Sequence, residues 1–216
     1  MNTIVLDLEF TDVYNPKYRK ICKSEIIQIG AVKLDENNNI VDKFDSYVRP
    51  LYSKINKNVY RLTGITDTMV EKAEIFDEVF TNFLNWIGDD DYTIISWSEE
   101  DLRVIISECN LRGFFDYRIE TMLFNWEDLQ ADVGNILGIT QHLSLEKVLK
   151  AINMDFEGTA HRALDDAENT ARVYLLTTNK EETKQALGSL VELFMPKDDL
   201  TYTMGNLFAG FVCKTA

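Results

Sequence analysis

The sequence predicts an α/β fold in which helices flank a mixed β-sheet. Three apolar runs suited to strands fill most of residues 3–48, whereas helical patterns predominate from residue 58 onward, with one further short strand at residues 92–97. Strands followed by alternating helices and strands are typical of a sheet covered by helices. The chain of 216 residues is long enough to bury one full core of this kind.

The first 48 residues contain the three strand-like runs. Residues 3–10 are rich in Ile, Val and Leu, as expected of a buried strand. Residues 25–34 and 40–48 are two more apolar runs, separated by an Asp-Glu-Asn-Asn-Asn turn. Because this connection is short, we expect the second and third strands to pair in antiparallel fashion.

Helical spacing of apolar residues is clearest in residues 75–87 and 163–178. Ser144 is a suitable N-cap for a third helix that extends to residue 152. The remaining elements have weaker patterns, and they are a helical turn at 58–62, a helix start at 66–67, a helix at 100–110 and a strand or turn at 121–130.

The last part of the chain, residues 179–216, differs from the rest. Residues 180–194 fit one more amphipathic helix, Pro196 ends it, and residues 200–211 show no clean period. We therefore predict a domain over residues 1–178 and a C-terminal extension over 179–216 that packs on it. This extension is also a candidate contact for a protein partner.

The composition is that of a soluble globular protein, with 45% hydrophobic and 27% charged residues. Neither a leader-like segment nor an apolar stretch of membrane-spanning length is evident, which predicts a cytoplasmic protein with no membrane contact. The three cysteines lie far apart and only two histidines are available. A structural zinc site or a disulfide framework is therefore not expected.

The charge balance restricts the class of partner. Lys and Arg number 22 against 36 Asp and Glu, a net charge of −14. This balance argues against tight non-specific binding to long nucleic acid, which needs a basic surface. It allows a metal-dependent enzyme acting on a short or single-stranded phosphate ester, where bound cations and a local basic patch supply positive charge. A local basic cluster lies in the polar, turn-like residues 11–24 and consists of Lys17, Arg19, Lys20 and Lys23.

Two acidic residues interrupt the first apolar run. Asp7 and Glu9 are two residues apart, so in a strand both side chains project from the same face. A buried, unpaired carboxylate is unfavourable, and two on one face are more so unless a cation lies between them. A hard divalent cation with oxygen ligands fits that role. Taken alone, the pair also fits an edge strand with a solvated acidic face.

Two later segments carry further candidate residues. Asp101 follows the predicted strand at residues 92–97, where α/β sheets gather ligands, although acidic residues also favour helix N-termini without any ligand. His161 lies at the junction into the helix at residues 163–178, and Asp166 follows five residues later. If His161 precedes the helix proper, it can overhang a site that Asp166 faces.

This ordered set of residues resembles the DEDD exonucleases of the DnaQ-like, ribonuclease H-like superfamily, in the branch whose general base is histidine. The resemblance extends over residues 3–178 and includes Glu-Ile-Ile-Gln-Ile-Gly-Ala-Val at 25–32 and Leu-Thr-Gly-Ile-Thr at 62–66. Within the superfamily the chain looks most like exonucleases that trim RNA 3′ ends, including the sporulation-inhibitor-like group. The resemblance implies a ribonuclease H-like mixed sheet of five strands flanked by helices.

The resemblance also implies the roles of individual residues. Two Mg²⁺ or Mn²⁺ ions per site are expected, held by Asp7, Glu9, Asp101 and Asp166. His161 is expected to act as the base, with Glu9 contacting both metal and substrate, and Asp165 is a rival to Asp166 that we interpret as a solvated neighbour. The residues expected to contact the terminal nucleotide are Glu9, Phe10, Leu62, Gly64, Ile65 and His161.

The implied activity is hydrolysis of single-stranded RNA or DNA from its 3′ end, with RNA favoured, to nucleoside 5′-monophosphates. Two alternatives remain open. One is a DNA proofreading or repair exonuclease of the same superfamily. The other is a regulatory protein-binding module that retains the exonuclease fold.

Overall fold

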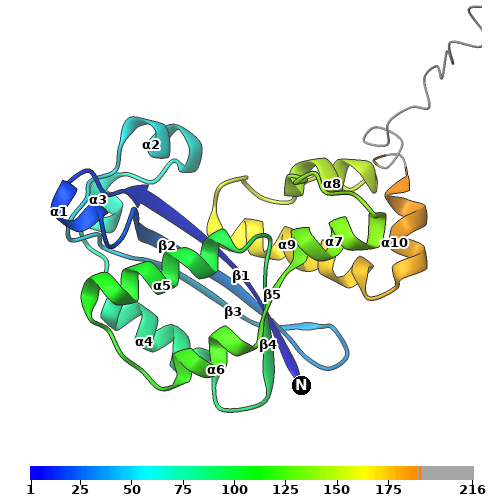
Figure 1. Cartoon of the computed structure of the whole chain (residues 1–216), viewed down its shortest axis with the longest axis horizontal. Coiled ribbons are helices and arrows are strands. Elements are labelled where there is room, and N and C mark those ends of the chain that lie inside the picture. Colours follow the sequence, from blue (N-terminus) through cyan, green and yellow to red (C-terminus); the bar gives the residue numbers. More distant parts are fainter. Residues whose placement is uncertain (189, 191–216) are drawn as a thin grey trace, which may run out of the picture.

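A computed structural model of the chain describes residues 1–188 and 190 (Figure 1). Five strands form one sheet in the order β3-β2-β1-β4-β5. The strands are β1 (Asn2–Asp12), β2 (Ser24–Leu34), β3 (Ile40–Tyr47), β4 (Tyr92–Ser96) and β5 (Trp126–Asp128). β1, β2 and β3 pair in antiparallel fashion, whereas β4 is parallel to both β1 and β5. The predicted mixed sheet and its antiparallel β2–β3 pair are confirmed.

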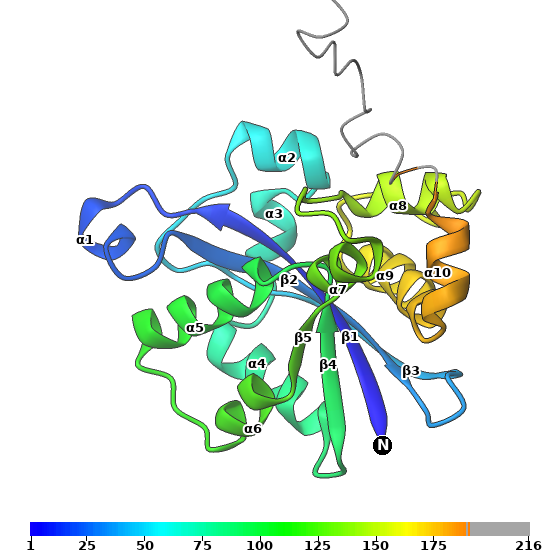
Figure 2. The same cartoon turned by 45° about the vertical axis from the view of Figure 1, so that its right-hand side comes forward.

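One face of the sheet is covered by α4 (Phe76–Ile87), α5 (Glu100–Arg112) and α6 (Arg118–Phe124) (Figure 2). Alternate residues of β1, Ile4 and Leu6 among them, pack here against the aromatic rings of α4. Phe76 and Phe80 stack with their ring centroids 4.9 Å apart. The aromatic side of α4 therefore fixes this helix against the centre of the sheet.

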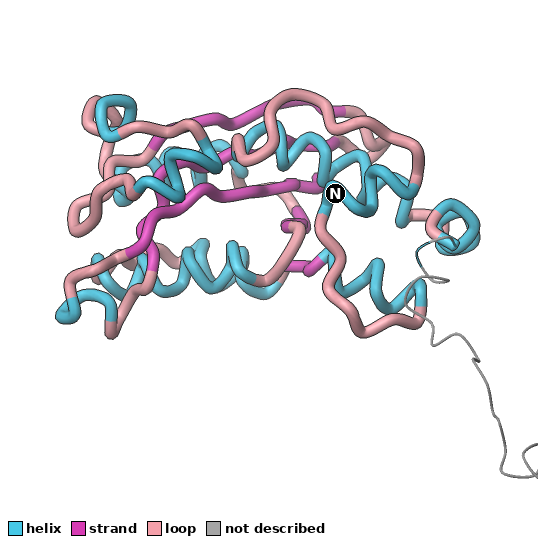
Figure 3. The backbone as a smooth tube through the Cα atoms, turned by 90° about the horizontal axis from the view of Figure 1, so that it is seen from above, coloured by secondary structure: helices cyan, strands magenta, loops and turns pink. Residues whose placement is uncertain are grey.

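The opposite face is covered by α7 (Leu129–Leu137), α8 (Leu145–Ala151), α9 (Ala163–Thr177) and α10 (Lys180–Ala186). Val5 of β1 packs into this second core together with Val32 and Ile95. Viewed from above, helices lie on both sides of the strands (Figure 3). The two faces of β1 thus belong to two different cores, and the face of Val5 is the one that also carries Asp7 and Glu9.

Three short helices lie at one end of the sheet, namely α1 (Pro16–Arg19), α2 (Lys57–Thr63) and α3 (Asp67–Val70) (Figure 1). Each has a side-chain N-cap. In α2, for example, the side-chain oxygen of Asn56 accepts from the amides of Asn58 and Val59. Since these helices bury few residues of their own, their positions depend on bonds to the rest of the fold.

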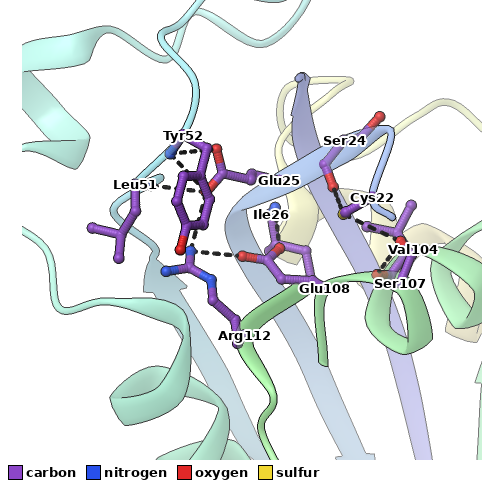
Figure 4. Close-up of polar contacts among 10 residues, drawn as sticks. All are labelled: Cys22, Ser24, Glu25, Ile26, Leu51, Tyr52, Val104, Ser107, Glu108 and Arg112. Carbon is purple, nitrogen blue, oxygen red and sulfur yellow. Dashed lines mark hydrogen bonds and ion pairs between the residues drawn. The ribbon is translucent and has the colours of Figure 1, made fainter. Parts of the chain in front are cut away.

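One such connection is a buried ion-pair network beneath α2 (Figure 4). The Arg112 guanidinium, whose side chain is 3% exposed, lies 3.1 Å from a Glu25 oxygen and 2.9 Å from a Glu108 oxygen. Glu25 also accepts from the amides of Leu51 and Tyr52. The network therefore joins β2 and α5 to the segment that leads into α2.

Most predicted elements are confirmed within about two residues, but three helices of the described part were not predicted. α1 lies in residues 11–24, which were predicted to be turn-like, and α6 and α7 overlap residues 121–130, where only a strand or turn was predicted. All three helices are short, and Gly134 interrupts the pattern of α7, so the periodic signal is weak there.

The C-terminal extension is described only in its first part. α10 ends at Ala186, Leu187 and Leu190 are buried in the second core, and the rest of the helix predicted at 180–194 and residues 200–211 lie outside the described residues. The domain boundary after residue 178 remains a prediction. Among the helices of the described part, none is both long and apolar enough to cross a membrane.

Candidate active site

The face of β1 that carries Asp7 and Glu9 points toward α9. Asp7 lies opposite Gly30 of β2, and Glu9 lies opposite Gln28. As predicted from the alternation of a strand, both carboxylates share the face of Val5. The register shifts just after Glu9, so the strand bends where the acidic pair ends.

A backbone contact at Gly30 brings α9 down onto this face. A Cβ atom on Gly30 would lie 2.1 Å from the Leu164 amide nitrogen, so any larger residue would displace the first turn of α9. The amide of Ala163 also donates to the side-chain oxygen of Gln28 at 3.4 Å. Because Asp7 is paired with Gly30, this contact sets the first turn of α9 beside Asp7.

Three carboxylates converge as a result. One oxygen each of Asp7, Glu9 and Asp166 lie within 4.8 Å of one another. The carboxylate of Asp166 is oriented by the amide of Arg162, which donates to its Oδ2 at 3.0 Å. Three oxygen donors at this separation can share a hard divalent cation.

Asp101 lies next to this group from the other side of β1. It belongs to the first turn of α5, it is buried, and its Oδ1 accepts from the Leu8 amide at 3.2 Å. One oxygen is thus engaged with the backbone of β1. The charge of Asp101 still acts on Asp7, whose pKa it helps to raise.

Burial raises the pKa of each of the four acids, and repulsion by the other acids adds to this effect at Asp7 and Glu9. Burial, followed by the charges of Asp101, Asp166 and Glu9, holds the pKa of Asp7 well above its usual range. Burial and the charges of Asp166 and Asp101 raise the pKa of Glu9 to about 8. Burial likewise raises the pKa of Asp101 to about 7 and that of Asp166 to about 6. Among the described residues, no lysine or arginine forms an ion pair with any of the four. The donor set therefore fits a hard divalent cation.

His161 lies in the loop just before α9, in the left-handed region with φ +63°. It lines the same cleft as Asp166, and its charge lowers the pKa of that carboxyl group against the effect of burial. Asp165 behaves differently, since its carboxylate accepts from the Thr159 amide at 2.8 Å and is thereby tied to the preceding loop. Of the two neighbouring aspartates, it is Asp166 that joins Asp7 and Glu9.

Asp7, Glu9 and Asp166 line a cleft of about 670 Å³ between β1, α2, α8 and the start of α9, whereas Asp101 does not line it. Phe10 and Leu62 line it, as predicted for contacts with a nucleotide. The structure corrects the prediction for Ile65, which is fully buried against Ile27 and Val70. Gly64 ends α2 with φ +70° and is not among the lining residues.

Other lining residues were not predicted, and they come from several elements of the fold. They are Leu8 and Asp12 of β1, Val59 and Thr63 of α2, Trp97 after β4, Gln130 of α7, Ser144, Leu145 and Glu146 at the start of α8, and Ala160 before α9. Trp97 donates its indole N–H to the Leu143 carbonyl oxygen at 3.1 Å, which holds the ring at the edge of the cleft. The Ser-Trp-Ser-Glu-Glu-Asp sequence around Trp97 was the one signal that could have indicated this wall of the cleft, because α7 was not predicted.

A mixed five-stranded sheet with an acidic cluster on its first strand and a histidine before its last long helix defines a ribonuclease H-like nuclease domain. The chain belongs to the exonuclease family, whose sequence profile matches residues 4–174.

Three curated relatives illustrate the range of this family. A PolC-type DNA polymerase III of Thermotoga maritima is 30% identical over 93% of this chain but only 13% of its own length. The 3′-5′ exoribonuclease 1 of Rattus norvegicus is 27% identical over 69% of this chain and 45% of its own. The probable 3′-5′ exonuclease KapD of Bacillus subtilis is 28% identical, over 85% and 86%. The chain therefore spans less than half the length of the first two.

Solved structures give the same assignment. A full-length 3′-exonuclease superposes with a TM-score of 0.68 and 25% identity, covering 81% of this chain and 59% of that one. The nuclease domain of 3′hExo, a DEDDh family member bound to rAMP, has a TM-score of 0.66 at 24% identity, covering 83% and 94%. The second similarity establishes the shared fold.

Proposed function

We propose that this protein is a metal-dependent 3′→5′ exonuclease that releases nucleoside 5′-monophosphates from single-stranded nucleic acid. The observation that carries the proposal is the convergence of Asp7, Glu9 and Asp166 within 4.8 Å, in a cleft that His161 also lines. Family membership and the names of the exonuclease relatives support the same reaction.

The four acidic residues would hold two Mg²⁺ or Mn²⁺ ions. Asp7, Glu9 and Asp166 supply oxygens that lie within 4.8 Å of one another. Asp101, which accepts a hydrogen bond from the Leu8 amide of β1, adds a further negative charge beside them. Ions bound there would supply the positive charge that lowers the pKa of an attacking water and that stabilises the leaving 3′ oxygen of a phosphodiester. Glu9, at the end of the acidic pair nearest Phe10, is in position to contact the substrate as well.

His161 would accept the proton of the attacking water. A histidine side chain exchanges protons near neutral pH, which suits a general base. The left-handed backbone at His161 turns the chain just before α9. The imidazole of His161, from this loop, and the carboxylate of Asp166, from the first turn of α9, therefore reach the same cleft. Phe10 and Leu62 would contact the base and sugar of the terminal nucleotide by stacking and apolar packing.

RNA is the proposed substrate, with DNA as the second candidate. The match to a 3′-5′ exoribonuclease supports RNA, whereas the match to PolC-type polymerases supports a deoxyribonuclease role. A cytoplasmic location and a protein partner for residues 179–216 remain predictions from the sequence.

The proposal is tested with RNA and DNA oligomers of one sequence, labelled at the 3′ end. We expect label release as mononucleotide in Mg²⁺ or Mn²⁺ and none in EDTA. Asp166→Asn should abolish release, while Asp165→Asn, the matched control, should retain it because an asparagine oxygen can still accept from Thr159. Metal-independent release, or full activity in Asp166→Asn, would refute the assignment.

The catalytic role of His161 can be tested separately from the folding of the protein by comparing kcat with KM. His161→Gln should lower kcat by about 10²–10⁴-fold, the usual contribution of a positioned base, with a much smaller change in KM. An unchanged kcat would show that another group accepts the proton.

A further inference from the structure

We infer that residues 13–24 and 46–66 form a basic surface that binds the substrate strand on the 5′ side of the nucleotide held in the cleft. We call these two segments together the basic platform. The inference rests on the proposed function, because it assigns the platform to the same single-stranded nucleic acid.

The charge distribution of the chain is strongly uneven. The two segments of the platform contain no Asp or Glu, yet they contain eight of the 22 Lys and Arg residues. The rest of the chain keeps 14 basic residues against all 36 acidic ones. A polyanion repelled by most of this surface would be attracted to the platform alone. The eight basic residues are Lys17, Arg19, Lys20, Lys23, Arg49, Lys54, Lys57 and Arg61.

The two segments meet in space although they are distant in sequence. The rings of Tyr18 and Tyr52 lie with their centroids 4.2 Å apart. Just before the first segment, the hydroxyl of Thr11 donates to the Lys54 carbonyl oxygen of the second segment at 3.0 Å. Figure 1 shows α1 and α2 at the same end of the sheet. The platform is thus one continuous part of the surface.

The platform begins where the cleft ends. On α2, Val59 and Leu62 line the cleft, whereas Lys57, Tyr60 and Arg61 are exposed. At 100° per residue the two sets occupy opposite sides of the helix, so α2 presents an apolar side to the cleft and a basic, aromatic side outward. A strand that leaves the cleft across α2 would therefore meet this basic side of the helix.

The basic side chains are available for binding. All eight are exposed, and the ion pairs found among residues 1–188 and 190 include none of them. Exposed tyrosines lie among them, Tyr14 at 62% and Tyr60 at 53% of their surface. Lysine and arginine with exposed aromatic rings are the combination that binds single strands, through phosphate contacts and base stacking.

Binding is measured by fluorescence anisotropy with a labelled 12-nucleotide RNA in EDTA, across a range of salt concentrations. The test variant is the triple substitution Lys17→Gln, Lys20→Gln, Lys57→Gln. Each phosphate contact contributes about 0.7 to the slope of log K against log salt, so the slope should become shallower by roughly 2 and affinity near 0.1 M salt should fall roughly 10- to 100-fold. The same measurement on DNA tests whether the platform distinguishes the two sugars.

The matched control removes three exposed lysines outside the platform, with Lys72→Gln, Lys150→Gln and Lys180→Gln. It changes the net charge equally, so we expect a slope close to that of the wild type. Equal weakening in both triple variants would overturn the inference, and so would wild-type binding by the platform variant. Competition by poly-glutamate as effective as that by RNA of equal charge would also overturn it, because it would assign the platform to an acidic protein.

A kinetic measurement separates this inference from the proposed function. Hydrolysis of thymidine 5′-(p-nitrophenyl) phosphate, which is too small to reach the platform, should be unchanged in the platform variant, while KM for the 12-mer should rise at least several-fold. If the wild type hydrolyses neither substrate, the proposed function fails, and the anisotropy result still decides the inference. If both are hydrolysed and the KM for the 12-mer is unchanged, the inference fails and the proposed function stands.

Discussion

Replacement of Glu9 by glutamine should stabilise the metal-free protein at pH 8, although it removes a residue of the proposed active site. Burial and the charges of Asp166 and Asp101 raise the pKa of Glu9 to about 8. Ionisation of this group therefore opposes folding at alkaline pH. Glutamine has nearly the same shape and never ionises, so the free-energy cost of ionising residue 9 in the folded protein disappears.

The magnitude follows from the shift in pKa. An ordinary glutamate, at 4.5, is fully charged in the unfolded chain at pH 8, whereas folded Glu9 with a pKa of about 8 is half protonated. One pKa unit corresponds to about 1.4 kcal/mol, so the raised pKa of Glu9 lowers the free energy of unfolding by roughly 4 kcal/mol at pH 8. Since the glutamine amide must also be desolvated, we expect a measured gain of about 2–4 kcal/mol.

The pH dependence has a definite sign. Between the two pKa values the folded state binds more protons than the unfolded state, so wild-type stability should fall as pH rises from about 5 to 8. The fall should be shallower in Glu9→Gln, and the two proteins should be nearly equal in stability at pH 5. The lowered pKa values of Asp35 and Asp116 act only in the acid range below this window.

Urea unfolding followed by tryptophan fluorescence, in EDTA at pH 5 and pH 8, measures these differences. Glu36→Gln, at an exposed position in the turn after β2, is the matched control and should change stability by less than about 0.5 kcal/mol. A Glu9→Gln protein no more stable than wild type at pH 8 would refute the electrostatic account. Mg²⁺ at 100 times its Kd should stabilise the wild type by about 2.7 kcal/mol, and Glu9→Gln by much less.

Two further substitutions test the framework that holds the site. Gly30→Ala would place a Cβ 2.1 Å from the Leu164 amide nitrogen, so α9 must move by about 1 Å, and we expect kcat/KM to fall roughly 100-fold and stability by about 1–3 kcal/mol. Gly188→Ala is the control, because no atom of residues 1–188 and 190 lies within 4 Å of its Cβ, and equal kinetics in both variants would contradict the account. Arg112→Leu leaves two buried carboxylates without their partner and should lower the free energy of unfolding by about 3–5 kcal/mol, as measured by urea unfolding. Arg103→Leu, which breaks an exposed pair on the same helix, should cost only about 0.3–0.5 kcal/mol, and a similar loss in the two arginine variants would show that burial is not the cause.

The sequence supported the sheet more fully than the site. The alternation of a strand was sufficient to place Asp7 and Glu9 on one face, because that inference needs only local geometry. No local rule joins residue 7 to residue 166, and the resemblance to a known family supplied that link. The contact that brings them together, Gly30 against the backbone of α9, has no side chain and hence no pattern to read.

The wall of the cleft was predicted less well, for a different reason. Leu62 lies in the last turn of α2 and Ile65 lies just after that helix, and no periodicity of the sequence distinguishes the exposed residue from the buried one. In the structure, Leu62 is 54% exposed and Ile65 is fully buried, since the chain reverses at Gly64. Gln130 lines the cleft from a helix whose weak apolar period left it unrecognised.

The contact at Gly30 also determines when the site can exist during synthesis. Asp7, Glu9 and Asp101 leave the ribosome well before Asp166, and α9 can reach Gly30 only after residues 163–177 have emerged. A chain whose synthesis has not reached residue 161 therefore lacks both Asp166 and His161, even when all five strands have been synthesised. Because domains generally fold as units and distant segments must meet first, a chain that ends before α9 would lack the complete acidic site.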